Sequence, residues 1–423
     1  MWVDVTVVAA LAFAAALAPL MSIPLLVWAE RKMSAFIQDR TGPNRAEILG
    51  LRLGGLVHPF ADVVKLITKE DLTPERADRF YYTLAPFLAL FVSLLAFAIL
   101  PLADTLHFGG RALPMRALTL NAGILYILAV TGFHVYAVVI AGWASHNGYA
   151  LLGGLRSAAQ MVSYELALGL SLVGVVLVAG TLDPGEIVAG QSGVLFGFLP
   201  RWNVFLQPVG FVLFLIALFA ETNRNPFDLP EGESEIIGFH VEYSSMRFAS
   251  FFMAEYASMF TGSAVAASLF FGGWQVPWIG TEALRANAPL VARVAFGALA
   301  AFCIVAALIA QGYKGRLARL YRDRRSREAT VLQMIFLFTA AVSLILLAFL
   351  STLPPWGAQV LIALVQGAFL LGKTLAFTFL FIWVRWTLPR FRYDQLMGLG
   401  WKSLVPLALL NLAVTGIVLL WFD

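Results

Sequence analysis

Ten long apolar stretches restrict this chain to one class of fold. An α-helix needs about 20 apolar residues to cross a bilayer. The stretches lie at residues 3–28, 83–103, 118–141, 161–180, 203–220, 247–272, 290–312, 331–353, 359–384 and 403–421. Only 13% of the residues are charged, whereas soluble proteins have about 25%. We therefore expect an all-α integral membrane protein with about ten transmembrane helices, in one polytopic domain over residues 1–423.

The positions of the basic residues predict how these helices cross the membrane. Of the 29 Lys and Arg residues, 23 lie in the odd-numbered connections between stretches. Those connections are residues 30–79, 142–160, 221–247, 313–329 and 385–402. Cytoplasmic loops are enriched in Lys and Arg, so we expect these loops in the cytoplasm and both termini outside. The first stretch has no basic start, so no cleavable signal peptide is expected.

The first of these loops, residues 30–79, contains a short segment with the pattern of a surface helix. Pro59 suits the first position of a helix. Apolar and charged residues after it fall on opposite faces, with Phe60, Val63, Val64 and Ile67 against Asp62, Lys65 and Lys69. The segment is too short to span a bilayer, so we expect an amphipathic helix at the membrane surface.

The loop at 221–247 is acidic. Its carboxylates are Glu221, Asp228, Glu231, Glu233, Glu235 and Glu242, and up to Glu242 only Arg224 opposes them. Like charges at close range repel, so some of these groups should hold a proton near neutral pH. At least one pair among Glu231, Glu233 and Glu235 should titrate as a coupled unit, above the pKa of a free glutamate. The pattern indicates proton handling; the alternative is an ordinary solvated loop.

Three glutamates and one lysine lie within or at the ends of apolar stretches, namely Glu165, Glu221, Glu255 and Lys373. A charge at mid-bilayer costs about 2.5–3.5 kcal/mol on the insertion scale, and such groups usually face the interior of a helix bundle. Together with the acidic loop, the glutamates favour a path for protons. Buried ion pairs, for instance between Lys373 and one glutamate, are the alternative.

The sequence predicts no redox centre, metal site or nucleotide site. The one cysteine, Cys303, cannot form an internal disulfide, and an iron–sulfur cluster takes about four cysteines. The five histidines lack the paired helical spacing of a bis-histidine haem site. No glycine-rich phosphate loop followed by Lys and Ser or Thr occurs, and no nucleic-acid partner is expected.

Nine segments in order carry a resemblance to a known family. They lie at residues 30–32, 38–45, 59–70, 142–145, 149–156, 163–165, 220–243, 253–256 and 389–397. They include Arg-Thr-Gly-Pro-Asn at 40–44 and Phe-Asp-Leu-Pro-Glu-Gly-Glu at 227–233. Over about residues 1–280 and 356–423, the chain resembles the quinone-binding membrane subunits of respiratory NADH:quinone oxidoreductase (complex I). These are known as the H-type subunit in bacteria and as subunit 1 in mitochondria.

The resemblance implies a proton-translocating enzyme subunit without a redox centre of its own. Quinone is the substrate, whereas NADH, FMN and the iron–sulfur clusters belong to partner subunits. The implied partners are the peripheral-arm subunits, the antiporter-like and small membrane-arm subunits, and the lipid bilayer. The implied location is the bacterial cytoplasmic (inner) membrane.

The resemblance also implies roles for individual residues. In the family, this subunit forms much of the quinone chamber, and a glutamate-rich path leads from the chamber toward the antiporter-like subunits. The expected quinone-binding residues are Glu30, Arg31, Arg40, Arg45, Phe60, Asp62, Lys65, Phe227 and Phe239. The expected proton path comprises Glu165, Glu221, Glu231, Glu233, Glu235, Glu242 and Glu255.

Two features depart from the family. His58 stands where the family usually has glutamine, and residues 281–355 add a transmembrane hairpin to a family core of eight helices. Two other functions compete with the quinone enzyme. One is the homologous membrane subunit of a membrane-bound hydrogenase, which need not bind quinone. The other is a secondary transporter, although the sequence lacks the internal repeat that transporters often have.

Overall fold

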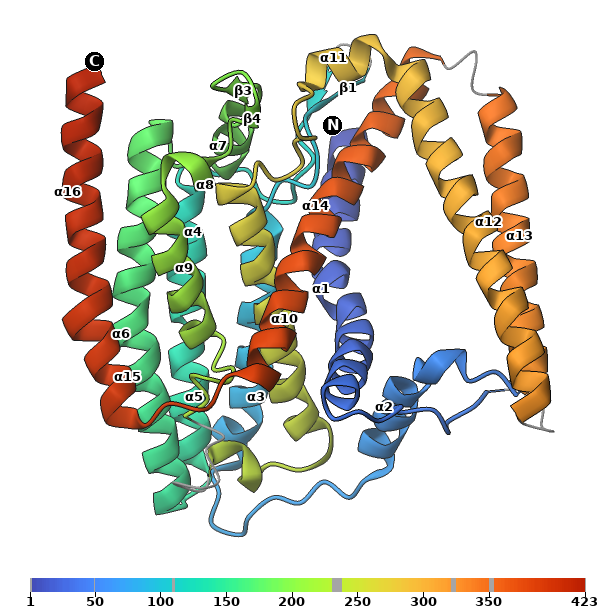
Figure 1. The fold of residues 1–423 in the computed structure, drawn as a ribbon. Helices are drawn as coiled ribbons and strands as arrows, with labels where there is room; N and C mark the ends of the chain where they lie inside the picture. The colour runs from blue at the N-terminus through green and yellow to red at the C-terminus, as the bar shows by residue number, and fades with distance from the viewer. Residues whose placement is uncertain are drawn as a thin grey trace.

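The computed structural model describes residues 2–48, 50–108, 111–229, 238–320, 325–349 and 354–422. In this part of the chain, long helices stand side by side and both termini lie at the same end of the bundle (Figure 1). We call this end the outer end; two small antiparallel hairpins, β1–β2 and β3–β4, lie there. The opposite, inner end carries α2 and the start of the acidic loop.

The helices of the ten predicted spans form most of the structure. In chain order they are α1 (Trp2–Ile37), α3 (Arg79–Leu95), α4 (Gly123–Gly132), α5 (His134–Ala144), α6 (Gly148–Ala179), α9 (Pro208–Glu221), α10 (Ser245–Phe270), α12 (Ala288–Leu320), α13 (Arg325–Phe349), α14 (Pro355–Thr387) and α16 (Val405–Phe422). The shorter elements are η1 (Leu53–Gly55), α2 (His58–Thr68), η2 (Ala96–Ile99), β1 (Leu106–Phe108), β2 (Arg111–Leu113), α7 (Pro184–Gly190), β3 (Val194–Leu195), β4 (Leu199–Pro200), α8 (Asn203–Leu206), η3 (Phe239–Glu242), α11 (Thr281–Ala286), α15 (Tyr393–Leu399) and the π-helical η5 (Gly400–Leu404).

Each of the ten predicted spans coincides with a helix or a pair of helices. Among the described residues, eight helical segments are long and apolar enough to cross a membrane. The other two are α9, with 14 residues, and α10, which contains many small and polar residues. From Met259 to Phe270 every residue of α10 is buried, so protein rather than lipid surrounds this half of the helix. The prediction of an all-α membrane protein is confirmed.

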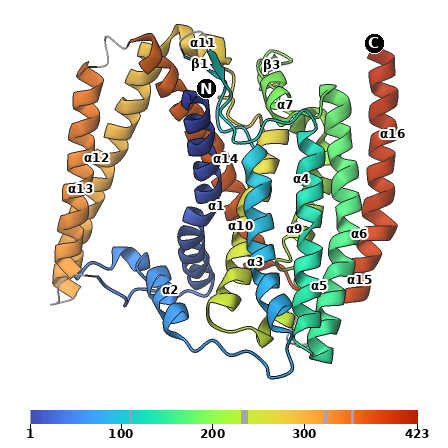
Figure 2. The ribbon, with the colours of Figure 1, turned by 180° about the vertical axis from the view of Figure 1, so that it is seen from behind.

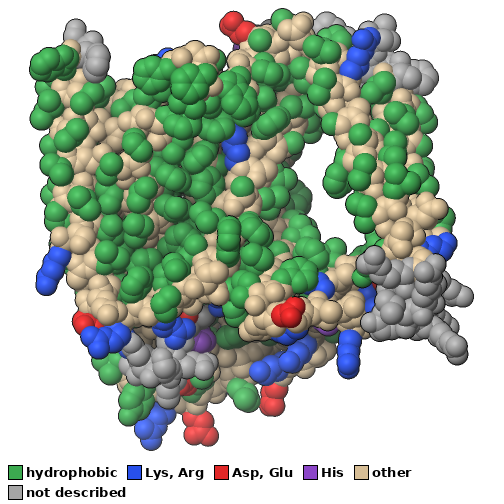
Figure 3. All heavy atoms as spheres, in the orientation of Figure 1, with side chains coloured by type: hydrophobic (Ala, Val, Ile, Leu, Met, Phe, Trp, Pro, Cys, Tyr) green, Lys and Arg blue, Asp and Glu red, His purple; other side chains and the backbone are tan. Residues whose placement is uncertain are grey.

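The distribution of charged side chains agrees with a helix bundle whose middle faces lipid. Figure 3 shows hydrophobic side chains over the middle of the bundle, whereas most of the Lys and Arg side chains in view gather at the inner end. α2 lies at this rim beside the base of α1 (Figure 2). The amphipathic helix predicted after Pro59 is therefore present, at the level expected for a membrane surface. Its placement on the cytoplasmic side stays a prediction.

Two helices extend further than their apolar stretches. α1 continues to Ile37, so the first nine residues after position 28 are still helical. Hydropathy ended this span too early because Glu30 and Arg31 are charged, yet Glu30 forms a buried ion pair with Arg224 and Arg31 pairs with Asp62 at the surface. α6 begins at Gly148 rather than at residue 161, and the Asn147 side chain caps it. Charged residues thus mark the end of an apolar stretch but not the end of a helix.

The main core lies where α6, α9 and α10 meet. Phe214 on α9 and Phe270 on α10 have ring centroids 5.2 Å apart. Glycine sets how closely α9 and α10 approach, because a Cβ at Gly262 would lie 2.5 Å from the Leu218 side chain.

α12 and α13 form a hairpin that stands apart from α1 (Figures 1 and 2). The described buried residues of the hairpin are small, namely Ala288, Ala292, Ala300, Cys303, Ala307, Ala329, Ala340 and Ser343. At the outer end the hairpin packs on α14, where Leu284, Ala288 and Ile362 form a cluster. At the inner end, the backbone N of Gly54 donates to Glu328 Oε1 at 3.2 Å. The hairpin lies within the predicted range 281–355; its status as an addition to the family core stays a prediction.

Lys373 on α14 bonds to backbone oxygens. Its Nζ donates to the carbonyl groups of Phe271, Gly273 and Gln275, each at 2.8 Å. These carbonyls follow the end of α10, where backbone oxygens lack helical partners. The positive charge also suits the negative end of the helix dipole. Lys373 therefore caps α10, whereas the sequence had left open an ion pair between Lys373 and a glutamate.

Replacing Lys373 with methionine should destabilise the bundle. Methionine fills a similar volume but leaves three buried carbonyl groups without their donor, so the free energy of unfolding should fall by roughly 2–4 kcal/mol. The thermal denaturation midpoint of the purified protein assembly measures this loss. Lys402→Met is the control, because Lys402 is exposed and should leave the midpoint unchanged. Equal midpoints for the two variants would contradict the capping role.

Candidate functional site

A cluster of buried charges joins four parts of the chain toward the inner end. Glu30 comes from α1, Arg224 from the loop after α9, Glu255 and Tyr256 from α10, and Arg385 from α14. Arg224 Nη1 lies 2.9 Å from Glu30 Oε2, and Arg224 Nε pairs with Glu255 Oε1. Arg385 Nη1 lies 2.9 Å from Glu30 Oε1. The Tyr256 hydroxyl donates to Glu30 Oε2 at 2.6 Å. We call these five residues the Arg224 cluster.

Arg224 is the centre of this cluster and is only 2% exposed. Its guanidinium lies over the Tyr256 ring, with Cζ 4.1 Å from the centroid. Burial alone would lower the pKa of Arg224, but Glu255 and Glu30 raise that pKa well above its ordinary value. The guanidinium therefore stays charged. Two carboxylates face two guanidinium groups, and such pairing is what allows charges to persist in a low-dielectric interior.

The start of the acidic loop, residues 222–229, is tied to the bundle beside the Arg224 cluster. Gln160 on α6 donates from Nε2 to the carbonyl oxygen of Phe227 at 2.8 Å. Arg390, which follows α14, lies with Nη2 2.7 Å from Asp228 Oδ2. These contacts fix the position of Arg224, because it lies between α9 and the two tied residues.

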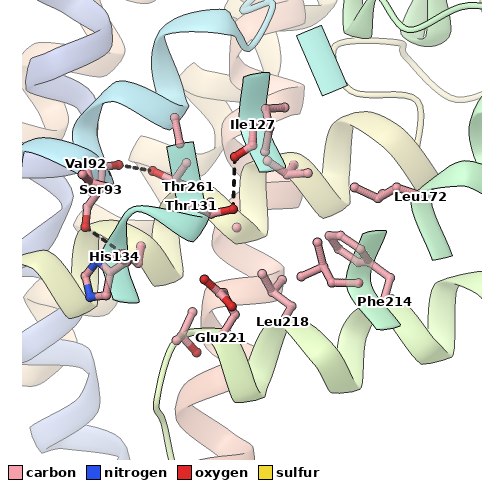
Figure 4. Close-up of a pocket in the computed structure, with 16 residues that line it drawn as sticks. Val92, Ser93, Ile127, Thr131, His134, Leu172, Phe214, Leu218, Glu221 and Thr261 are labelled. Atoms are coloured by element: carbon pink, nitrogen blue, oxygen red, sulfur yellow. Dashed lines mark hydrogen bonds between the residues drawn. The ribbon is translucent and has the colours of Figure 1, made fainter. Parts of the chain in front are cut away.

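Glu221, the last residue of α9, borders two small cavities in the bundle interior (Figure 4). The first has a volume of about 50 Å³, and the second, of about 60 Å³, extends to Glu255. His134, Thr222 and Ser258 border both. A buried water needs roughly 10–15 Å³ of such volume, so each cavity has room for several waters. Glu221 Oε2 is buried and accepts no hydrogen bond from the described residues.

Glu165 on α6 approaches the same region. Its Oε1 lies against Gly132, where an added Cβ would come within 2.7 Å of that oxygen. Glycine at the end of α4 therefore makes room for the carboxylate. Glu165 and Glu221 are close enough to interact electrostatically. The bundle thus holds two neighbouring carboxylates with few polar partners.

A larger cavity lies at the inner end, between α1 and α2. Its volume is about 430 Å³, and Arg31, Arg40, Arg45 and His58 are among its lining residues, none of which is acidic among those described. Arg31 Nη1 pairs with Asp62 Oδ2 on α2 at 2.7 Å. His58 Nε2 accepts a hydrogen bond from the backbone N of Arg45 at 3.2 Å. Phe60, Val63, Val64 and Ile67 on α2 are 46–62% exposed, so protein leaves that face of the helix uncovered.

The predicted quinone-binding residues fall into separate groups. Arg31, Arg40 and Arg45 line the inner cavity, Asp62 pairs with Arg31, and Phe60 and Lys65 are exposed on α2. Glu30 instead belongs to the Arg224 cluster. Phe227 and Phe239 are 5% and 6% exposed and pack against other aromatic rings, among them Tyr164 and Phe251. The two phenylalanines occupy packing positions here, and their contact with quinone stays a prediction.

The predicted proton-path residues are partly connected. Glu221 and Glu255 share a cavity, and Glu165 interacts with Glu221. Glu242 Oε1 instead accepts from Asn147 Nδ2 at 2.5 Å, at the start of α6. Glu231, Glu233 and Glu235 lie outside the described residues, so their coupled titration stays a prediction.

Sequence reasoning missed three residues of the site: Tyr256, Arg385 and His134. Each carried a weak signal, because each is a polar or charged residue near or within an apolar stretch. Tyr256 and Arg385 contact Glu30, which lies more than 80 residues away in the chain, and His134 borders cavities. No local sequence pattern could therefore identify these three residues. Among the described residues, no group of three His, Cys, Asp or Glu side chains could hold a metal ion.

Comparisons with known proteins identify the relatives of this chain. A family model described as NADH dehydrogenase matches residues 8–320 and 329–416. The chain is 44% identical over 405 residues to an H-type subunit of NADH-quinone oxidoreductase from Solibacter usitatus, and the match covers 95% of this chain and 93% of that protein. It is 41% identical to the H-type subunit from Flavobacterium psychrophilum, covering 93% of this chain and 92% of that protein. It is also 39% identical to NADH-quinone oxidoreductase subunit 8 of Rhodothermus marinus, covering 95% and 94%.

The fold and the site define a multi-pass membrane protein whose interior carries linked ionisable residues. Matches over nearly the whole chain, at about 40% identity, name the family. The chain belongs to the NADH dehydrogenase family and is a subunit, of the H type, of an NADH-quinone oxidoreductase. Other subunits of that complex are therefore its partners.

Proposed function

We propose that this subunit forms the quinone chamber of the complex and couples quinone reduction to proton translocation through its buried glutamates. The observation that carries the proposal is that Glu255 belongs both to the charged cluster and to the lining of a cavity. Its side chain pairs with Arg224 in the charged cluster and also borders the cavity that Glu221 shares. A change of charge near the Arg224 cluster would thus be felt directly by groups that can exchange protons with the interior of the bundle.

The inner cavity and α2 support the location of the chamber. An amphiphilic quinone needs an apolar surface for its tail and a polar site for its headgroup. The exposed apolar face of α2 offers the first, and the cavity lined by Arg31, Arg40 and Arg45 offers the second. Coupled carboxylates respond to such chemistry because their protonation depends on nearby charge.

The proposal leaves the electron-transfer chemistry to other subunits. NADH, FMN and iron–sulfur clusters would be bound by the peripheral arm, which would dock at the inner end, and the antiporter-like and small membrane-arm subunits would receive the proton path. The complex would then lie in the cytoplasmic membrane of a bacterium, with the acidic loop in the cytoplasm.

The proposal predicts that Asp62→Asn and Arg45→Ala impair the reduction of quinone. Both should raise the apparent KM for quinone several-fold and change the sensitivity to quinone-site inhibitors. Assembly should persist, because the Arg31–Asp62 pair is 44% and 38% exposed and such pairs add about 0–1 kcal/mol. NADH oxidation by a soluble electron acceptor should stay normal, because it needs only the peripheral arm.

Asp394→Asn serves as the matched control. It also removes an exposed aspartate–arginine pair, with Arg392 at 2.8 Å, but it lies on α15, away from α2. If Asp62→Asn and Arg45→Ala both leave quinone affinity and inhibitor sensitivity unchanged in an assembled complex, this cavity is not part of the quinone chamber.

A further inference from the structure

A tightened turn in a membrane-spanning helix lies next to a histidine in the bundle interior. α4 ends at Gly132 and α5 begins at His134. At Phe133, between them, the backbone bonds join residues three apart, from Phe133 N to the Val130 oxygen at 3.1 Å and from Tyr136 N to the Phe133 oxygen at 3.2 Å. Such tight stretches within a helix often mark functional positions. The turn serves two groups, because Gly132 makes room for the Glu165 carboxylate and His134 borders both small cavities.

His134 and Glu221 are the ionisable residues that border both cavities. Figure 4 shows both side chains among the residues that line the first cavity, on the side away from Leu172. In the second cavity, Glu255 and His240 add two further ionisable groups. No hydrogen bond to the His134 ring is recorded among the described residues. Nearby hydroxyls are satisfied elsewhere, since Ser93 and Ser258 bond to each other at 2.8 Å. Water in the cavities is therefore the natural partner of the ring.

We propose that His134 is a proton carrier that works with Glu221 to pass protons between the two cavities. The inference rests on the proposed function and adds a residue to its path. A neutral imidazole has one acceptor nitrogen and one N–H donor. The acceptor nitrogen would take a proton from water in the second cavity, which Glu255 borders, and the other nitrogen would release its proton to water in the first cavity or to Glu221, which borders both cavities. After both transfers the ring is neutral again, but the N–H now lies on the other nitrogen, and tautomer exchange or rotation of the ring restores the starting arrangement.

The test is His134→Gln and His134→Ala in the complete complex. Both should lower NADH-driven quinone reduction and proton pumping together by about 10²-fold, the low side of what a positioned proton-transfer group contributes. NADH oxidation by a soluble acceptor should stay normal. Added imidazole should restore the activity of the alanine variant, because the deleted side chain enlarges cavities that a small base can fill. His107→Gln, on β1 at the outer end, is the matched control and should behave as the wild type.

The outcomes separate this inference from the proposed function. Normal coupled activity in the glutamine variant, or a loss that imidazole does not reverse in the alanine variant, overturns the role of His134. If the alanine variant does not assemble, the glutamine variant decides, because it keeps polarity and similar bulk. Glu255→Gln and Glu221→Gln are measured in parallel. If only the two glutamate variants lose activity, the proposed function holds and the role of His134 does not. If the two glutamate variants and the two His134 variants all keep normal activity, both the proposed function and the role of His134 are wrong.

Discussion

Replacing Arg224 with methionine should abolish NADH-driven quinone reduction and also weaken the assembled complex. Arg224 is buried and is the charge that Glu30 and Glu255 share. Removing one member of a buried ion pair leaves an uncompensated charge and costs about 3–5 kcal/mol. The measurements are the thermal midpoint of the purified complex, the yield of assembled complex and the rate of quinone reduction. All three should fall.

Two further variants show whether electrostatics cause this loss. Arg224→Lys keeps the charge but not the forked geometry, in which Nε and Nη1 contact different carboxylates. Lysine should restore part of the stability and little of the activity. Adding Glu255→Gln to Arg224→Met should recover stability, because contacting residues are not additive and one uncompensated charge disappears. A double variant less stable than Arg224→Met would mean that packing, not charge, holds the cluster.

The membrane fold could be predicted because hydropathy and length act locally. The stretches at 83–103 and 331–353, for example, needed only their own residues to indicate α3 and α13. The surface helix after Pro59 was also predictable, because its apolar residues repeat with the helical period. The ends of the helices were predicted less well. α1 extends beyond its apolar stretch because Glu30 forms ion pairs with Arg224 and Arg385, which lie far away in the sequence.

The site was predictable in its residue types but not in its contacts. Glu221 and Glu255 stood out as acids beside apolar residues, yet nothing local shows that they share a cavity. Lys373 stood out as well, but its partners are three backbone oxygens, and every residue carries such an oxygen. Sequence therefore indicates that a buried charge needs a partner, and tertiary structure decides which partner it finds.

The second large effect is expected for Glu221→Gln, with a different signature from that of Arg224. Glu221 Oε2 accepts no hydrogen bond from the described residues and its carboxylate interacts with that of Glu165. Glutamine keeps the size of the side chain and breaks no ion pair, so assembly and the thermal midpoint should stay normal. It cannot titrate, however, so quinone reduction and proton pumping should fall together, by about 10²-fold if Glu221 transfers protons directly.

Glu165→Gln should act in the same direction, and Gly132→Ala provides a companion variant that removes no carboxylate. An alanine Cβ at this position would lie 2.7 Å from Glu165 Oε1, so the carboxylate must move away while its charge remains. If position and titration both matter, Gly132→Ala should reduce coupled activity without changing the peripheral-arm reaction. Normal coupled activity in Glu221→Gln and Glu165→Gln would instead return these glutamates to a structural role. In that case the proton path would have to run through carboxylates other than the interacting pair on α6 and α9.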